Sequence, residues 1–91
     1  MTAQGTQLEV LKTIADIQEA TFIEEIEDLR IAEEIDLDVR VVRSALDALS
    51  QAGYVELEKV KTLSGIAYNA FLTEQGELAL RESRSLMSEE I

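Results

Sequence analysis

The sequence predicts an α+β domain in which a three-helix core is followed by a β-hairpin and a C-terminal helix. Apolar residues recur at helical spacing through the first half of the chain. A change to β-branched and aromatic residues follows Gly53, in two runs separated by Ser64-Gly65. The segment that begins at Thr73 then returns to helical spacing.

A first helix is expected from Thr6 to about Gln18. Thr6 and Glu9 have the spacing of a capping box, in which each side chain satisfies a free backbone amide of the other residue. The apolar residues that define its buried face are Leu8, Leu11, Ile14 and Ala15. The β-favouring stretch 21–23 is expected either as a brief strand or as the entry to the next helix.

Two further helices are expected at 26–34 and about 38–52, joined by a tight turn. Asp38 has a side chain that caps helix N-termini, and Gly53 can adopt the left-handed conformation that ends a helix. The core-facing stripe of the third helix consists of Val42, Ala45, Leu46 and Leu49.

The hairpin and the last helix complete the expected domain. Ser64-Gly65 is a weaker turn pair than Asn-Gly, but it separates two strand-like runs at 54–63 and 66–72. Thr73 is expected to cap the last helix. With 91 residues, the chain 1–91 is expected to form a single domain with its core at about 6–82 and a frayed end at 83–91.

Composition excludes several classes of protein. The 46% hydrophobic content is typical of a globular domain, and the chain has no cysteine and no histidine. It therefore lacks disulfides, the commonest general base and the commonest zinc ligand. No apolar run reaches the roughly 18 residues that span a bilayer, and the N-terminus has no secretion signal. A cytoplasmic location is expected.

Three segments resemble the winged helix-turn-helix regulators of bacteria, of the MarR-like and PadR-like kind. Residues 31–38, with the sequence IAEEIDLD, resemble the helix-turn segment usually written L-A-E-E-L-G-L-S. Val42, Leu49 and the run 53–55 match the pattern V-x6-L-x3-G-[LY]-[VI]. Residues 68–76 are similar to the "LTEKG" segment that closes the wing. The resemblance covers about residues 8–82.

The resemblance implies how the two helices of the motif meet. Ala32 stands where a small side chain lets the helices approach closely. Ile35 and Leu37 stand where apolar residues fill the corner. Asp36 replaces the usual glycine of the turn, and aspartate tolerates the left-handed conformation better than most residues. We therefore expect the turn to form.

The resemblance also implies a transcriptional regulator that reads double-stranded DNA with the third helix (about 38–52) and the wing (about 54–72). Arginine is the usual reader of guanine in the major groove. The candidate nucleic-acid-binding residues are Arg40, Arg43, Ser44, Lys59 and Lys61. The alternative for the arginines is pairing with Asp36, Asp47 or acids of the second helix. The alternative for the lysines is an exposed charged strand beside Glu56 and Glu58.

The charge distribution permits DNA binding without requiring it. The formal net charge is −11, and the first 35 residues carry −7 of it. The expected third helix and wing are nearly neutral, with four basic residues where a typical DNA-binding protein makes roughly 6–10 phosphate contacts. Val39 and Val41 fall where the family often has small polar residues, and exposed valines there suit a protein surface better than phosphates.

The alternative function is an acidic winged-helix interaction module that binds a basic protein partner and no nucleic acid. An acidic face on the first two helices would attract such a partner and repel DNA. The regulator hypothesis instead implies a homodimer that places two reading helices on a palindrome. The candidate interface residues are Leu78, Leu80, Leu86 and Met87. Their alternative role, for Leu78 and Leu80, is to complete the core of the monomer.

Other chemistry has little support in the sequence. Asp36, Asp38 and Asp47 resemble part of a calcium loop, but the loop glycine and the terminal glutamate are missing. The acids at 24–28 are typical of a solvated helix face near a helix N-terminus. No glycine-rich phosphate loop is present. We expect no enzyme activity, no metal site and no cofactor.

Overall fold

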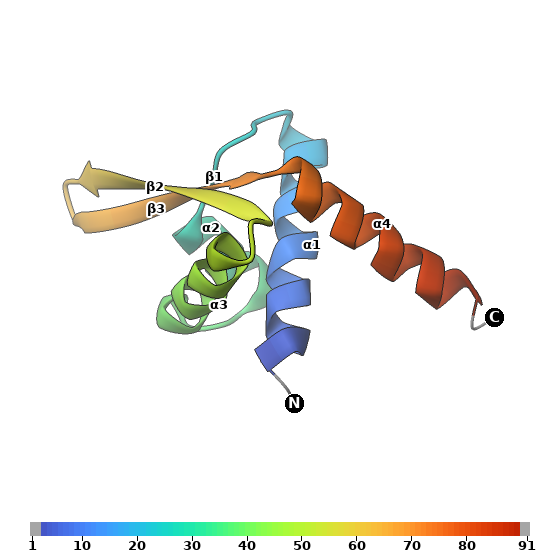
Figure 1. Cartoon of the computed structure of the whole chain (residues 1–91). Helices are drawn as coiled ribbons and strands as arrows, with labels where there is room; N and C mark the ends of the chain where they lie inside the picture. Colours follow the sequence, from blue (N-terminus) through green and yellow to red (C-terminus); the bar gives the residue numbers. More distant parts are fainter. Residues whose placement is uncertain (1–2, 90–91) are drawn as a thin grey trace.

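Helices α1, α2 and α3 pack together beside a small antiparallel sheet in the computed structural model of the chain (Figure 1). The structure describes the backbone of residues 3–89 and the side chains of residues 5–83. In chain order the elements are α1 (Ala3–Thr21), β1 (Ile26–Glu27), α2 (Asp28–Ile35), α3 (Val39–Gln51), β2 (Val55–Thr62), β3 (Gly65–Leu72) and α4 (Glu74–Glu89). The predicted α+β class is confirmed within these residues, with four helices and one three-stranded sheet.

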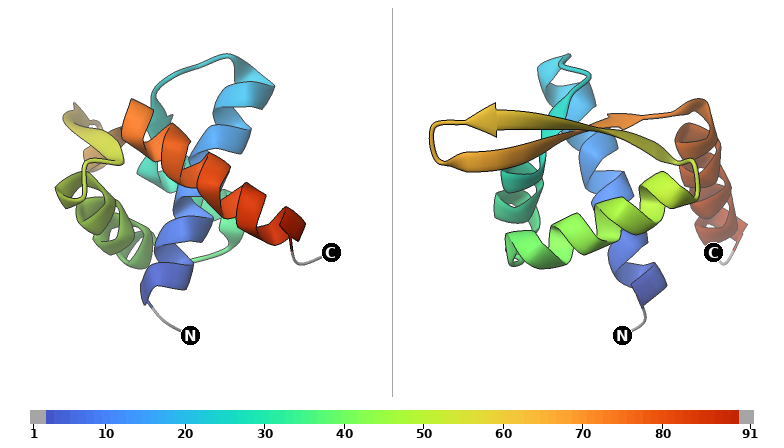
Figure 2. Two further views of the ribbon diagram at one scale, coloured as in Figure 1. Left: turned by 45° about the vertical axis from the view of Figure 1, so that its right-hand side comes forward. Right: turned by 60° about the vertical axis from the view of Figure 1, so that its left-hand side comes forward.

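The sheet has the strand order β1-β3-β2, and both neighbouring pairs are antiparallel. Strands β2 and β3 form the predicted hairpin, in register from the pair Val55–Leu72 to the pair Thr62–Gly65. The hairpin extends beyond the helices as a narrow arm (Figures 1 and 2), and the longest dimension of the molecule is 47 Å.

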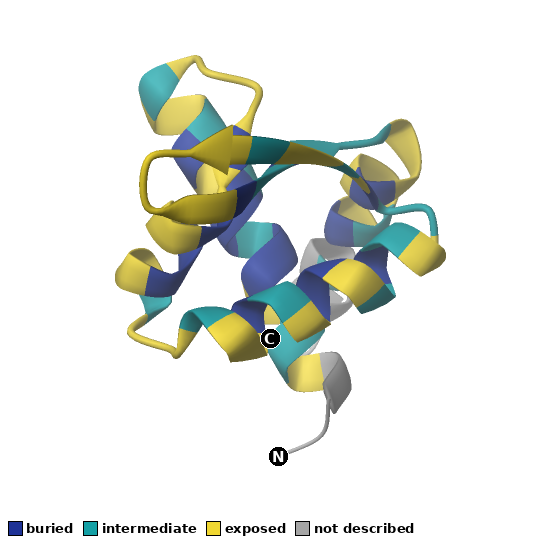
Figure 3. Cartoon of the chain, turned by 90° about the vertical axis from the view of Figure 1, so that its left-hand side faces the viewer, coloured by how far each residue is buried: buried dark blue, intermediate teal, exposed yellow. Residues whose placement is uncertain are grey.

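The core lies between the three packed helices and the inner face of the sheet. Figure 3 shows that the buried segments of these helices face one another, whereas the hairpin tip and the loop after α1 are exposed. Helix α4 contributes Leu80 to this core and then runs away from the body (Figure 1). The buried apolar cluster consists of Val10, Leu11, Ile14, Ile17, Ile26, Ile31, Ala32, Val42, Ala45, Leu46, Leu49, Val55, Ala70 and Leu80.

The first helix is longer at both ends than the sequence predicts. It begins at Ala3, so Thr6 lies inside the helix and the predicted N-cap at Thr6 is wrong. It continues to Thr21 and ends at Phe22, whose backbone is left-handed with φ 60°. Because Phe22 leaves the extended region, the alternative of a strand at 21–23 is also wrong.

The strand β1 lies later in the chain than the predicted stretch 21–23. The two residues Ile26 and Glu27 pair with Ala70 and Asn69 of β3. Helix α2 therefore begins at Asp28, two residues after the predicted start. A strand of two residues has no alternating pattern to detect, which explains why the sequence does not reveal it.

The turn between α2 and α3 forms as expected. Asp36 is left-handed with φ 56° and ψ 47°, and the Asp38 carboxylate caps α3 by accepting a hydrogen bond from the Arg40 backbone N–H at 2.8 Å. Ala32 is buried where the helices meet, and Ile35 packs against the core. Leu37 is 37% exposed, so its expected role in filling the corner is wrong.

Thr73 joins the end of α3 to the beginning of α4. Its hydroxyl donates to the Gly53 carbonyl at 2.6 Å and accepts from the Gly76 N–H at 3.1 Å, which is the predicted N-cap. Its own N–H donates to the Tyr54 carbonyl at 3.1 Å. A Cβ at Gly76 would collide with that carbonyl, so only glycine lets the first turn of α4 approach so closely. The helix extends to Glu89, past the point where the sequence predicts fraying.

Candidate interaction surface of helix α3 and the hairpin

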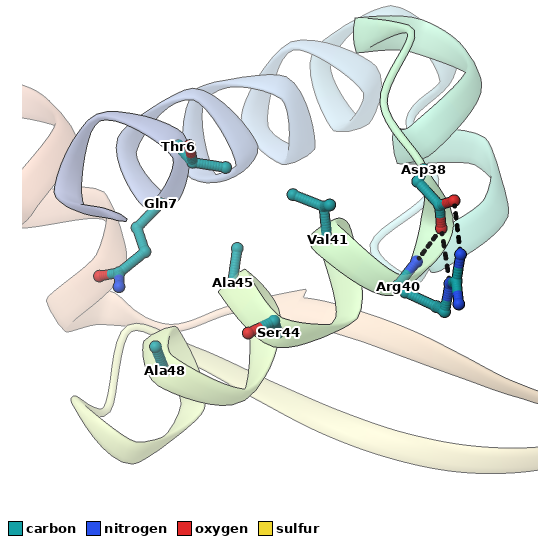
Figure 4. A pocket seen from close by; sticks show the side chains of 8 residues that line it. All are labelled: Thr6, Gln7, Asp38, Arg40, Val41, Ser44, Ala45 and Ala48. Carbon is teal, nitrogen blue, oxygen red and sulfur yellow. Dashed lines mark hydrogen bonds and ion pairs between the residues drawn. The ribbon is translucent and has the colours of Figure 1, made fainter. Parts of the chain in front are cut away.

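The outer face of α3 borders an open groove whose other wall is the N-terminal part of α1. Thr6 and Gln7 lie on the α1 side of this groove, which has a volume of about 590 Å³ (Figure 4). The α3 side is mainly apolar or small, and the Asp38–Arg40 pair lies at its end. Its α3 lining residues are Arg40, Val41, Ser44, Ala45 and Ala48.

The predicted DNA contacts Arg40 and Ser44 are both exposed on this face. The Arg40 guanidinium donates to both carboxylate oxygens of Asp38 at 3.3 Å, although its side chain is 86% exposed. These hydrogen bonds, and the one from the Arg40 backbone, lower the pKa of the Asp38 carboxyl from its usual 3.8. Arg40 is therefore paired but accessible.

Arg43 has a different environment from Arg40. Its Nε donates to Oδ2 of Asp28 at 2.6 Å, and its Nη2 donates to the Ile66 carbonyl of β3 at 3.0 Å. The guanidinium also lies 5.7 Å from the ring centroid of Tyr68, within the range of a cation–π contact. The hydrogen bond to Asp28 raises the pKa of the Arg43 guanidinium. Arg43 thus connects α2, α3 and β3 from a partly exposed position, with 36% of its side chain accessible, and the alternative of a pair with an acid of the second helix is confirmed for Arg43.

The expectation that the acids at 24–28 form a solvated helix face is wrong for Asp28. Its side chain has no exposed surface, and its Oδ1 accepts the Leu29 N–H at 2.8 Å. A signal was present in the sequence, because Asp28 stands three, four and seven residues before Ile31, Ala32 and Ile35. That spacing places Asp28 on the buried face of α2, where a charge requires a partner.

Lys59 and Lys61 lie on the helix-facing side of the hairpin. Glu56 and Glu58 alternate with Leu57 and Lys59 along β2, and successive side chains of a strand point to opposite faces. The lysines therefore share a face with Leu57, while the glutamates of β2 occupy the other face. Both lysines are exposed, and among residues 5–83 the structure shows no ion pair for either.

A second hollow, of about 270 Å³, separates α3 from the hairpin. It is lined by Arg43, Leu46 and Asp47 of α3 and by Leu57 and Tyr68 of the hairpin. The Asp47 carboxylate is exposed here, although it also accepts a hydrogen bond from Gln51 at 3.2 Å. The face between α3 and the hairpin therefore mixes both signs of charge with apolar surface.

The predicted dimer residues are only partly accessible. Leu80 is 4% exposed and belongs to the core of the monomer, so its prediction as an interface residue is wrong and its alternative role in the core is confirmed. Leu78 is 53% exposed and stays available for contact. The side chains of Leu86 and Met87 lie outside the residues that the structure describes.

The calcium alternative gains nothing from the structure. Asp36 and Asp47 lie on a turn and on the body of a helix, and Asp38 is occupied as a cap. Within the described part of the chain, no group of three or more acidic side chains is placed to hold a metal ion. Nor does any described helix combine the length and apolarity needed to cross a membrane.

The chain matches no protein-family model, no curated protein and no solved structure. Its function is therefore argued from the surface itself.

Proposed function

We propose that this chain is a winged-helix domain that acts as an acidic protein-interaction module. The element order supports the winged-helix assignment: a helical pair joined by a tight turn is followed by an antiparallel hairpin and a last helix. In this assignment α2 and α3 are the helix-turn-helix, and β2 and β3 are the wing.

The hydrogen bonds of Arg43 are the main support for a protein-interaction module rather than a DNA-binding protein. Arg43 is one of only two arginines on the helix expected to read DNA, and its guanidinium bonds a buried carboxylate and a β3 carbonyl. Moving Arg43 to a phosphate or a guanine would leave the Asp28 charge buried without its partner, which is strongly unfavourable. The helix therefore has Arg40 as its one readily available cation.

The remaining charges of this face are close to balanced. Arg40, Lys59 and Lys61 are opposed by Asp38 and Asp47 on the same side of the molecule. Three available cations are fewer than the roughly 6–10 phosphate contacts of a typical DNA-binding protein. The overall charge of −11 adds a long-range repulsion of DNA.

The groove beside α3 suits a protein partner better than phosphates. Val41 is 44% exposed and lines the groove with Ala45 and Ala48. Apolar grooves of this kind accept the apolar face of a helix or an extended segment.

DNA binding is the second candidate function, and one observation favours it. Lys59 and Lys61 project from the same face of the hairpin, away from Glu56 and Glu58. A homodimer would double the available cations from three to six, which approaches the lower end of typical phosphate contact numbers.

A titration with fluorescent mixed-sequence duplex DNA separates the two functions. We expect no saturable change in anisotropy at low salt, where electrostatic attraction is strongest. Saturable binding that fades with salt would overturn the interaction module and support the regulator. In that case Lys59→Ala with Lys61→Ala should weaken binding, while Glu56→Ala with Glu58→Ala, on the opposite face, should not.

A further inference from the structure

The loop between α1 and β1 presents two apolar side chains to solvent. Phe22 is 92% exposed, and the neighbouring Ile23 is 51% exposed. Most of the large apolar side chains in the described part of the chain are buried or packed against the core. Aromatic residues, phenylalanine among them, are enriched at protein interfaces relative to the rest of the surface.

The backbone of this loop is held in place by its own hydrogen bonds. The Phe22 N–H donates to the Gln18 carbonyl at 2.8 Å, and the Gln18 side-chain amide donates to the Glu24 carbonyl at 2.6 Å. The Ile23 N–H donates to the Thr21 hydroxyl at 3.3 Å. The side chains of the loop are therefore displayed from a defined backbone, which reduces the entropy lost on binding.

A hollow of about 200 Å³ lies at this loop, and Ile23 lines it whereas Phe22 does not. Its apolar lining comes from Ile17, Ile23 and Ile26. Glu25 and Glu27 are charged groups of its lining, together with Arg30. The loop thus offers a projecting aromatic group next to an apolar depression bordered by carboxylates.

The charge around the loop is strongly negative. Glu24, Glu25 and Glu27 are all exposed, and Glu19 adds a fourth carboxylate from the last turns of α1. Arg30 is the one cation that lines the hollow, and its Nε lies 3.9 Å from Oε2 of Glu34. A partner of the opposite charge is therefore favoured, and polyanions are repelled.

We propose that this loop docks a basic amphipathic segment of a partner protein. Apolar side chains of that segment would contact Phe22 and enter the hollow, while its lysines and arginines would face the surrounding glutamates. The inference rests on the proposed function as an interaction module and gives that function a location and a partner chemistry.

Figures 1 and 2 show that the loop lies on one side of the sheet and α3 on the other. The docking site is thus separate from the groove beside α3.

The test uses a fluorescent helical peptide of leucine and lysine, with leucine at helical spacing, and a scrambled peptide of the same composition. We expect the amphipathic peptide to bind more tightly than the scrambled one. Phe22→Asn should weaken its binding about tenfold or more, because the aromatic contact is central. Glu24→Lys with Glu25→Lys should weaken it similarly, and the affinity should fall as salt is added.

Two matched controls locate the effect. Leu63→Asn removes a fully exposed apolar side chain at the hairpin tip. Glu9→Lys with Glu82→Lys makes the same charge change at two exposed residues of α1 and α4 that do not line the hollow. Neither control should change the affinity for the amphipathic peptide as strongly as the loop variants do.

Four results would overturn the inference. They are the absence of peptide binding, equal binding of both peptides, no effect of Phe22→Asn, and self-association through Phe22 in sedimentation, which would assign the loop to a second copy. If the peptide still binds to the Phe22→Asn variant, the proposed docking site is wrong, whereas the proposed function as an interaction module is not contradicted. The DNA titration reports separately on the proposed function, so the two failures are distinguishable.

Discussion

Arg43 of α3 and Asp28 of α2 form a 2.6 Å hydrogen-bonded ion pair whose carboxylate is completely buried. The pair is 15 residues apart in the chain, and Arg43 extends it to the hairpin through the Ile66 carbonyl. The Arg43 guanidinium therefore links α3 to both α2 and β3. Every buried side-chain nitrogen or oxygen in the described residues has a partner.

Arg43→Ala should destabilise the fold, because it leaves a carboxylate at the fully buried position of Asp28 without its cation. Burying that carboxylate unpaired should lower the free energy of unfolding by about 3 kcal/mol. Urea denaturation followed by circular dichroism measures the change. The double variant Asp28→Leu with Arg43→Met should recover most of the loss, since an apolar pair replaces an ion pair without leaving a charge. A single variant as stable as the native chain would show that the ion pair does not hold these elements together.

Ala32→Leu tests the crossing of α2 with its neighbours. Ala32 is 7% exposed, so the larger side chain should overpack the core and cost about 1–3 kcal/mol. Ala20→Leu makes the same change at an exposed position of α1 and should stay within about 0.5 kcal/mol of the native chain. Equal stability of the two variants in urea would mean that a leucine side chain fits at position 32 without overpacking the core.

The cap of α3 should depend on pH. The pKa of Asp38 is lowered in the folded chain, so its stabilising effect is complete above the unfolded value of 3.8 and is lost as the pH falls through the lower folded pKa. At neutral pH, Asp38→Ala should lower the melting temperature by about 5 °C. The difference should shrink below pH 3.8. Asp38→Asn keeps an uncharged cap, so its melting temperature at neutral pH should lie between those of Asp38→Ala and the native chain. A difference that stays constant down to acid pH would contradict the role of the charge.

Phe22→Gly should stabilise the chain, although it removes an aromatic side chain. A left-handed backbone costs an ordinary residue about 1–2 kcal/mol, whereas glycine adopts it freely and loses part of that gain through its flexible unfolded state. A net increase of about 0.5–1 kcal/mol is expected in urea denaturation. Ile23→Gly, at a neighbour without positive φ, should have the opposite sign. A loss of stability in both variants would show that the Phe22 side chain packs on the fold.

The second half of the fold could be predicted closely because its signals are local. Asp38, Gly53 and Thr73 act where the sequence places a cap or a turn, and the alternation of 54–72 gives the hairpin. The first half could not, because the left-handed Phe22 and a two-residue strand have no periodic pattern. Leu37 shows the same limit, since its exposure depends on packing between distant elements, and for Leu80 the sequence left an interface role and a core role open.

The candidate site was harder to predict than the fold. The sequence correctly places Arg40, Ser44, Lys59 and Lys61 on exposed surface, because helix and strand periods determine which face each residue occupies. It left two roles open for Arg43, a DNA contact or a pair with an acid of the second helix, because the choice depends on how α2 and α3 pack. The polar residue on the apolar face of α2 was the available signal.

Thr73 has a consequence for the motions of the molecule. The Thr73 hydroxyl hydrogen-bonds to Gly53 after the end of α3 and to Gly76 in the first turn of α4. The backbone N–H of Thr73 also donates to the Tyr54 carbonyl. The amides at the two helix ends should therefore become protected from hydrogen exchange as one cooperative unit rather than fray independently. A partner that displaces α3 would transmit that displacement to α4, so the projecting helix can report occupancy of a surface it does not touch.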